Sequence, residues 1–222
     1  MIGASHDPSD NDAEITRRVA DRAHQKGPSV DAKLGMPRGV EEDIVGDEGN
    51  ACLMNQNEVV EFIQRTGWDA PAAAIGTSHG ADKFMGQQSI HFEVSGGIRD
   101  KVKAAGFPPV PLVMHGSSSV PKEEVVPINA AGGTLDPGVC AMNEEKYLPA
   151  VRSGVMKVNI DTEGRVVWTR VHREYFRDRP GKFDFRPSAK IFMHEYAKFI
   201  AHKATKLGSA GKVVETKESL NP

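Results

Sequence analysis

The sequence predicts an α/β fold in which parallel strands alternate with helices. Short apolar runs alternate with stretches of helical periodicity at intervals of about thirty to forty-five residues, which is typical of βα units. The apolar runs are continuous rather than alternating, as expected for strands that are covered on both faces. These two observations leave open whether the sheet is a barrel or an open, doubly wound sheet.

In the first half of the chain, apolar residues at helical spacing alternate with short strand-like runs. Ile15, Val19 and Ala23 lie on one face of a predicted helix, which the Gly27-Pro28 pair ends. The predicted elements are a strand at 1–4, a helix at 12–26, a strand at 29–32, a loop rich in Gly, Pro and acidic residues at 35–50, a helix at 58–65 and a strand at 72–76.

The second half continues the same alternation. Its predicted elements are a helix at 91–105, a strand at 111–114, helices near 122–129 and 143–152, a strand at 156–160, a helix at 165–177 and a last helix that ends near 206. Residues 1–212 are expected to form one domain, and residues 213–222 are expected to form a loose tail.

The composition excludes several classes of protein. With 222 residues, 39% of them hydrophobic and 26% charged, the chain is long enough for one well-packed domain. A formal net charge of −2 gives no reason to expect a nucleic acid or a charged membrane as a partner. No apolar run approaches the ~18 residues that span a bilayer. The N-terminus lacks the pattern of a signal peptide, and the two cysteines have no paired spacing, so the cytoplasm is the expected location.

Polar clusters follow three successive predicted strands. They are His79-Gly80, His115-Gly116-Ser117-Ser118 and Asn159-Ile160-Asp161-Thr162. The carboxyl ends of parallel strands are where ligands bind, so two histidines there are suited to share a metal, zinc above all. The following Gly and Ser residues are suited to bind a phosphate. The alternatives are a hydrogen-bonded structural role for each histidine, helix capping by Asn159 and Asp161, and a solvated loop face for residues 41–43.

Longer strings in the chain resemble the signatures of class II fructose-bisphosphate aldolases. The strings run in the family's order at residues 74–84, 112–121, 153–162, 182–186 and 208–211. The resemblance implies a TIM (β/α)₈ barrel, present here in part as about five C-terminal βα units, with its active site at the C-terminal face. It also implies reversible aldol cleavage of fructose 1,6-bisphosphate, as in glycolysis or gluconeogenesis, with zinc as the Lewis acid.

The resemblance also implies roles for individual residues. His79 and His115 match two of three zinc-binding histidines, and Glu42 or its neighbour Glu41 matches the acid that moves the proton of the substrate. Arg186 matches an arginine that reaches into a neighbouring subunit, which implies a dimer or tetramer. The expected contacts with the phosphosugar are Gly80, Lys83, Gly116, Ser118, Asn159, Asp161 and Thr162.

Three departures from the family pattern accompany the match. The family has about three more strands before the position of Met1, with an Asp-His pair that supplies the third zinc ligand. Gly3 and Lys33 stand where the family has acidic residues near the metal. We therefore expect a fragment of a longer gene product. The alternatives are a non-catalytic, degenerate phosphosugar-binding relative and an aldolase for another ketose bisphosphate, such as tagatose or sedoheptulose bisphosphate.

Overall fold

The computed structural model divides the chain into two compact units. The first contains Met1–Ser117 and Ala150–Ile160, and the second contains Ser118–Pro149 and Asp161–Pro222. The residues that the structure describes are 9–34, 38–41, 44–45, 54–72, 75, 78–79, 90–136 and 142–214. In these residues, no helix is long and apolar enough to cross a membrane.

The first unit contains a four-stranded parallel sheet whose strands lie in chain order. The strands are β1 (Asp31–Lys33), β4 (Ala70–Ala72), β6 (Leu112–Met114) and β7 (Val155–Val158). A doubly wound sheet reverses its strand order at a switch point, whereas a barrel adds each parallel strand beside the preceding one. The observed order is therefore that of a segment of a barrel.

An ion pair shows that this sheet is curved. Lys157 on β7 and Asp31 on β1 lie on the two edge strands, yet Nζ and Oδ2 are 2.8 Å apart. Three strand spacings of ~4.8 Å would separate the two backbones by ~14 Å in a flat sheet, which is beyond the reach of these side chains. The two side chains therefore meet across the concave face. All three residues of the inner strand β6 are buried, as the continuous apolar run predicted.

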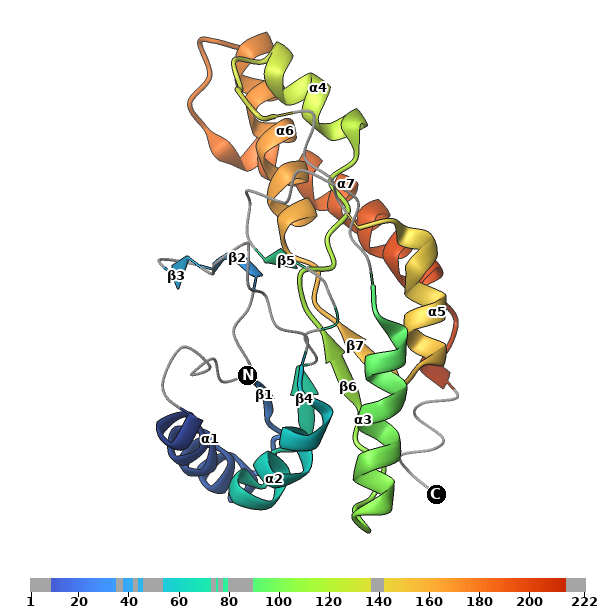
Figure 1. Cartoon of the computed structure of the whole chain (residues 1–222). Coiled ribbons are helices and arrows are strands. Elements are labelled where there is room, and N and C mark those ends of the chain that lie inside the picture. The colour runs from blue at the N-terminus through green and yellow to red at the C-terminus, as the bar shows by residue number, and fades with distance from the viewer. Residues whose placement is uncertain are drawn as a thin grey trace. The chain divides into compact units, whose positions relative to one another are not determined.

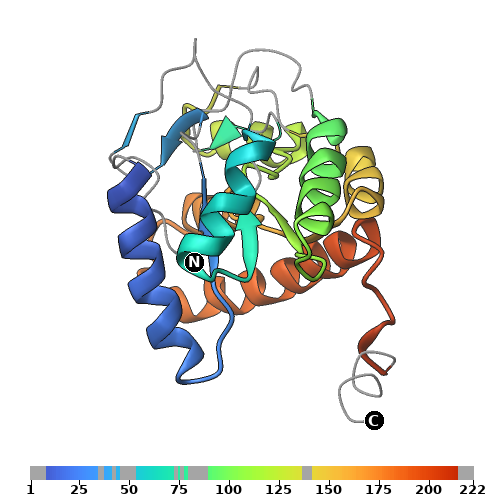
Figure 2. The same cartoon turned by 60° about the horizontal axis from the view of Figure 1, so that its bottom comes forward.

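Three helices follow one another outside this sheet (Figures 1 and 2). They are α1 (Ser9–His24), α2 (Gln56–Thr66) and α3 (Phe92–Ala104), and α2 packs against both of the others. The side chain of Asn55 caps α2 at its N-terminus by accepting from the N–H of Asn57. Gly67 ends α2 in the left-handed region, with φ 66°. These helices confirm the predictions at 12–26, 58–65 and 91–105, with shifted ends.

The first unit also contains a second, three-stranded sheet, which corrects the prediction for residues 35–50. Its strands are β3 (Ile44–Val45), β2 (Arg38–Glu41) and β5 (Ser78–His79), and β2 pairs antiparallel with β3 and parallel with β5. The prediction of an unbroken loop at 35–50 was therefore wrong, because strands of two to four residues are too short for periodicity to reveal. The strand predicted at 72–76 is β4, which ends at Ala72. The strand predicted at 1–4 lies outside the described residues.

The second unit is helical. Its elements are α4 (Lys122–Ala130), a 3₁₀ turn η1 (Glu144–Lys146), α5 (Tyr147–Arg152), which continues into the first unit, α6 (Thr162–Asp178) and α7 (Phe185–Lys206). Helix α6 packs against α4 and α7 (Figure 1). Helix α6 begins three residues before the predicted start at 165, because its first N–H groups are capped from outside the helix.

Candidate active site

In the first unit, His115 and Asn159 lie side by side just beyond the ends of two adjacent strands. Met114 of β6 pairs with Val158 of β7, so the next residue along each strand is brought to the same level. His115 is buried, and the Asn159 side-chain nitrogen lies 2.9 Å from its Nε2 and 3.3 Å from its Nδ1. An amide N–H donates, so the ring nitrogen that receives it carries a lone pair.

A neutral histidine ring has one such lone pair, which is also what zinc takes from histidine, so a zinc ion would replace the amide of Asn159 at this nitrogen. The described residues contain no group of three His, Cys, Asp or Glu side chains that could hold a metal ion. His79 lies in β5 opposite Gly39 of β2, and its side chain lies outside the described part of the chain. The donor type of His115 therefore fits zinc, while the rest of the predicted ligand set stays a prediction.

In the second unit, Ser118 joins Asp161 and Thr162. The N–H groups of Asp161 and Thr162 both donate to Ser118 Oγ, each at 3.2 Å. Asp161 occupies the N-cap position of α6, but its side chain makes no capping bond and pairs instead with Arg165 at 2.7 Å. The buried hydroxyl of Ser118 thus takes over the capping of α6.

This arrangement has the properties of an anion site. The N-terminus of a helix presents N–H groups and a partial positive charge, and both favour a phosphate. Here both N–H groups, those of Asp161 and Thr162, already donate to Ser118 Oγ, so an anion at this position would have to displace that hydroxyl. The convergence of these three residues is what the polar cluster after β7 predicted; their contact with a phosphosugar stays a prediction.

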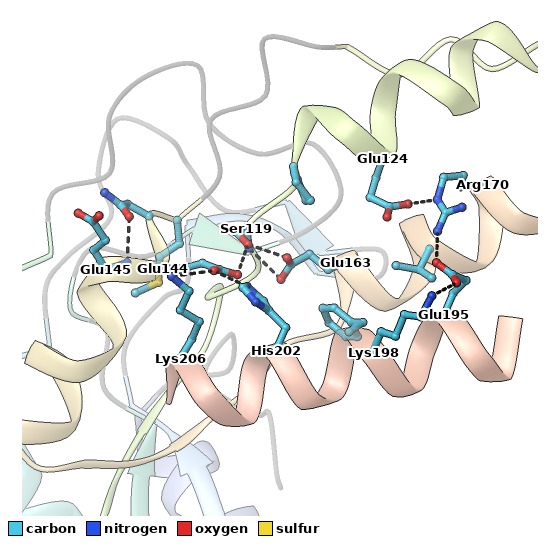
Figure 3. Close-up of a pocket in the computed structure, with 15 residues that line it drawn as sticks. Ser119, Glu124, Glu144, Glu145, Glu163, Arg170, Glu195, Lys198, His202 and Lys206 are labelled. Atoms are coloured by element: carbon cyan, nitrogen blue, oxygen red, sulfur yellow. Dashed lines mark hydrogen bonds and ion pairs between the residues drawn. The ribbon is translucent and has the colours of Figure 1, made fainter. Parts of the chain in front are cut away.

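Beside Ser118, a buried ionic network surrounds Ser119 (Figure 3). The carboxylate of Glu163 accepts from Ser119 N at 3.1 Å and from Ser119 Oγ at 2.6 Å. Lys203 Nζ lies 2.9 Å from Ser119 Oγ and 2.7 Å from Glu163, and it also pairs with Glu144. The sequence did not reveal this network, because nothing in the pattern of α7 separates Lys203 from the other lysines of that helix.

The network shifts the pKa of Glu144 and that of Tyr147. Burial alone would raise the pKa of Glu144, but hydrogen bonds from Lys203 and His202 outweigh it and hold that pKa below its ordinary value of 4.5. Burial raises the pKa of the Tyr147 hydroxyl, and the negative charges of Glu163 and Glu144 raise it further. Glu144 is therefore held in its charged form and Tyr147 in its neutral form at neutral pH.

A cavity of about 560 Å³ adjoins the network in the second unit (Figure 3). On another part of its lining, Arg170 lies 3.3 Å from Glu195 and also pairs with Glu124. His202 lies 2.7 Å from Glu144 on the side of the network. These charged side chains are thus engaged with one another, and we assign them a structural role.

The other predicted site residues fall in different places. Gly116 follows His115 with φ 63°, a conformation that favours glycine. Arg186 lies in the first turn of α7, its side chain is 78% exposed, and it pairs with Asp184 at 2.7 Å. The pKa of Asp184 is lowered by that hydrogen bond. Gly80, Lys83 and Glu42 lie outside the described residues, as does Gly3.

Lys33, which stands where the resemblance expects an acid, is the last residue of β1. It is 6% exposed. Lys33 and Asp31 lie two residues apart on the same strand and so point to the same face, the face on which Asp31 meets Lys157. A buried ammonium group therefore stands near the C-terminal end of this strand.

Comparisons with known proteins agree with these observations. A family profile described as class II fructose-bisphosphate aldolase matches residues 1–212. The fructose-bisphosphate aldolase of Giardia intestinalis is 38% identical over 225 residues, which cover 99% of this chain and 67% of that protein. The fructose-bisphosphate aldolase of Thermus caldophilus is 35% identical over 213 residues, with 96% and 67% coverage.

A solved structure is similar as well. The crystal structure of the YdjI aldolase from Escherichia coli K12 superposes with a TM-score of 0.64 at 22% identity, covering 96% of this chain and 60% of that chain. At this identity the likeness concerns the fold alone. It confirms the predicted type of fold, a TIM barrel of which this chain covers a part.

Proposed function

Because this chain belongs to the class II fructose-bisphosphate aldolase family, a family of lyases, we propose that its protein cleaves fructose 1,6-bisphosphate reversibly. The products are dihydroxyacetone phosphate and glyceraldehyde 3-phosphate. The chain spans about two thirds of the length of the curated relatives that it matches. The activity is therefore proposed for the whole protein to which these residues belong, in the cytoplasm and in sugar metabolism.

The observation that carries this proposal is the capped N-terminus of α6. Two N–H groups and the hydroxyl of Ser118 converge there. A dianionic phosphate at this point would gain the helix dipole, and it would compete with Ser118 Oγ for the two N–H groups. The proposed contacts of the phosphate of dihydroxyacetone phosphate, as the family resemblance implies them, are Gly80, Lys83, Gly116 and Ser118, and the rest of the sugar is assigned to Asn159, Asp161 and Thr162.

Zinc is the proposed metal, and His79 and His115 are its proposed ligands. The chemistry that a bound divalent ion supplies in such a site is Lewis-acid polarisation of the ketone carbonyl. Asn159 supports this assignment only by holding the ring in position, because the lone pair to which its amide donates is the one that a zinc ion would need.

Glu42 is the proposed proton carrier. Aldol cleavage needs a group that exchanges a proton with the carbon atom next to the carbonyl. Gly39 of β2 pairs with His79 of β5, and Glu41 ends β2 two residues further on, ~7 Å along the strand. This register supports an acidic residue at 41 or 42 near the proposed metal. Arg186, exposed at the start of α7, is proposed to contact a phosphate in a second copy of the protein.

Lys33 favours a second candidate function. A buried ammonium group on the sheet face that also carries Asp31 repels a divalent cation rather than binding it. The second candidate is therefore a phosphosugar-binding protein without catalytic activity. An aldolase for tagatose or sedoheptulose bisphosphate is a variant of the first candidate.

The two candidates differ in metal content and turnover. We would measure bound zinc and the cleavage of fructose 1,6-bisphosphate by the whole protein to which these residues belong, with the His115→Gln variant as a control. Stoichiometric zinc and EDTA-sensitive cleavage, both reduced in the variant, are expected of the enzyme. Binding of dihydroxyacetone phosphate without zinc and without turnover would overturn the first candidate in favour of the second. The same assay with tagatose bisphosphate tests the specificity.

A further inference from the structure

Helix α7 carries a row of apolar side chains that the described part of the chain leaves partly or largely exposed. Phe185 is 64% exposed, Met193 is 69% exposed, and Ile200 is exposed as well. The apolar residues recur every three or four positions, as one face of a helix requires, and the row consists of Phe185, Ala189, Phe192, Met193, Tyr196 and Ile200. We call these residues the α7 row, which is ~22 Å long.

Trp168 of α6 lies beside the α7 row. It is 45% exposed, and its ring packs edge-on against Phe192 with the ring centroids 4.9 Å apart. Phe192 in turn lies 5.0 Å from Tyr196, and these three rings line an open groove of about 430 Å³. Single exposed apolar residues are common, but a contiguous patch with Trp, Tyr and Phe is typical of a contact with another protein. We call Trp168 and the α7 row together the aromatic face.

One end of the aromatic face lies beside the start of α6. Helices α6 and α7 lie side by side and run in opposite directions (Figure 1), since Lys203 near the end of α7 pairs at 2.7 Å with Glu163 in the first turn of α6. A Cβ atom built on Gly164 would lie 3.0 Å from the ring of Tyr196. Residues 196–203 of α7 therefore flank the start of α6, where the candidate site of the second unit lies.

Arg186 lies at the other end of α7. It precedes Met193 by seven residues, and Ile200 follows Met193 by seven residues. Seven residues of a helix correspond to ~10 Å along its axis. Met193, in the middle of the α7 row, is therefore as far from Arg186 as it is from the part of α7 that flanks the candidate site.

We propose that the aromatic face is the contact between two copies of this chain, related by a two-fold axis that passes near Met193. Such an axis makes the two α7 helices antiparallel, so it places Arg186 of each copy level with Ile200 of the other copy. Arg186 then lies beside the start of α6 in the other copy. The supply of Arg186 to that copy's substrate site rests on the proposed function, whereas the contact between the two aromatic faces does not.

The charges around Arg186 fit this arrangement. Residues 173–190 contain six Lys and Arg residues against three Asp and Glu residues. Each copy thus brings a basic end to the end of the other copy at which a sugar with two phosphate groups is proposed to bind. Arg186 pairs with Asp184 within its own copy, but this pair is exposed, and exposed pairs are weak enough to be exchanged for a phosphate. Both ends are matched at once only by a second copy, which favours a second copy over an unrelated protein.

Sedimentation velocity of the whole protein to which these residues belong measures the contact. We expect the unsubstituted protein to form a dimer. Met193→Glu places one carboxylate from each copy at the axis, so the dissociation constant of the dimer should rise at least ~100-fold. His194→Glu is the matched control, because it adds the same charge at an exposed position outside the α7 row. It should leave the dissociation constant unchanged.

Cysteine cross-linking locates the axis. A residue at a two-fold axis meets the same residue of the other copy, so Met193→Cys should form a disulfide between the two copies under mild oxidation. Ile200 lies ~10 Å along α7 from the axis, so the two cysteines of an Ile200→Cys dimer are ~20 Å apart and should not cross-link. The unsubstituted protein, which keeps Cys52 and Cys140, provides the background.

Mixed dimers test whether Arg186 acts in the other copy. Arg186→Ala and His115→Gln are each expected to cleave fructose 1,6-bisphosphate poorly when expressed alone. In a mixed dimer, the site with an intact His115 receives Arg186 from the other copy. Co-expression of the two variants should therefore restore about a quarter of the unsubstituted turnover, because about half of the dimers are mixed and one of their two sites is complete.

The outcomes separate the contact from the proposed function. A monomeric unsubstituted protein would overturn the contact, and this result is expected if the part of the protein outside this chain covers the α7 row. A Met193→Glu variant that dimerises as tightly as His194→Glu would overturn the contact as well. A dimer that Met193→Glu dissociates, but that has no turnover, would overturn the proposed function and leave the contact in place. An active dimer whose mixed form regains no turnover would overturn only the role of Arg186.

Discussion

The hydroxyl of Ser118 caps the N-terminus of α6. This role usually belongs to the side chain of the N-cap residue of the helix itself. The natural candidate for that task, Asp161, pairs with Arg165 and leaves its capping position without a side-chain bond. A cap that comes from another segment ties the start of α6 to the residues after β6.

At the scale of single residues, Glu144→Gln should lower stability in a pH-dependent way. The folded protein holds the pKa of Glu144 below 4.5, so this carboxylate stabilises the fold above that pH and loses its contribution as the pH falls through the folded pKa. We expect the variant to lose about 1–3 kcal/mol at neutral pH and to approach the unsubstituted chain in acid.

Urea unfolding at a series of pH values between neutrality and acid measures this difference. Glu145→Gln is the control, because Glu145 is the exposed neighbour of Glu144. A constant difference between Glu144→Gln and the unsubstituted chain at every pH would contradict the assigned role of Lys203 and His202.

At the scale of elements, two glycines differ in whether the backbone requires a glycine at their position. Gly67 ends α2 with φ 66°, a conformation that L-residues rarely adopt. Gly96 lies inside α3, and a Cβ atom built on it meets nothing within 4 Å. The first glycine is required by the backbone and the second is not.

We therefore expect Gly67→Ala to destabilise the protein by about 1 kcal/mol, and Gly96→Ala to stabilise it by about 0.5–1 kcal/mol. Thermal or chemical unfolding of both variants in parallel provides the measurement. Effects of the same sign would mean that the two helices do not have the ends and packing described here.

Some elements could be predicted from the sequence and others could not. The inner strand β6 and the meeting of His115 with Asn159 could be predicted, because a buried parallel strand has a continuous apolar pattern and its end is followed by polar residues. The short strands β2 and β3 could not be predicted, because they are defined by their pairing with each other and are too short to show a periodic pattern. The start of α6 was missed because its cap, Ser118, lies 44 positions before Thr162.

The burial of Lys203 could not be predicted from the sequence either. Its partners Glu144 and Glu163 come from a 3₁₀ turn and from the start of another helix. Lysine is usually exposed in helices, and only the packing of α7 on α6 makes this one a buried cation. Tertiary contacts of this kind leave no pattern along the chain.

At the scale of the whole sheet, the pair between Asp31 and Lys157 reports the curvature. The pKa of Asp31 is held below its ordinary value of 3.8: burial alone would raise it, but the hydrogen bond and the charge of Lys157 oppose that effect. We expect a double-mutant cycle with Asp31→Asn and Lys157→Met to give a coupling of about 0.5–1 kcal/mol, limited because Lys157 is half exposed.

Unfolding of the two single variants and the double variant at neutral pH completes this cycle. The coupling should disappear when Asp31 is protonated, because a group with a lowered pKa stabilises the fold only while it is charged. A coupling of zero at neutral pH would mean that the ion pair between Asp31 and Lys157 does not form, and so would contradict the curvature of the sheet.

The same ion pair has a kinetic consequence. Asp31 and Lys157 are 126 positions apart in the chain, and they meet only after the strands between them have assembled. Contacts of such high sequence separation form late, because the entropy of closing a long loop opposes them early in folding. Removing the pair should therefore speed unfolding and leave the folding rate nearly unchanged, which corresponds to a φ-value near zero. The curved sheet would then resist opening through a contact that does nothing to help it form.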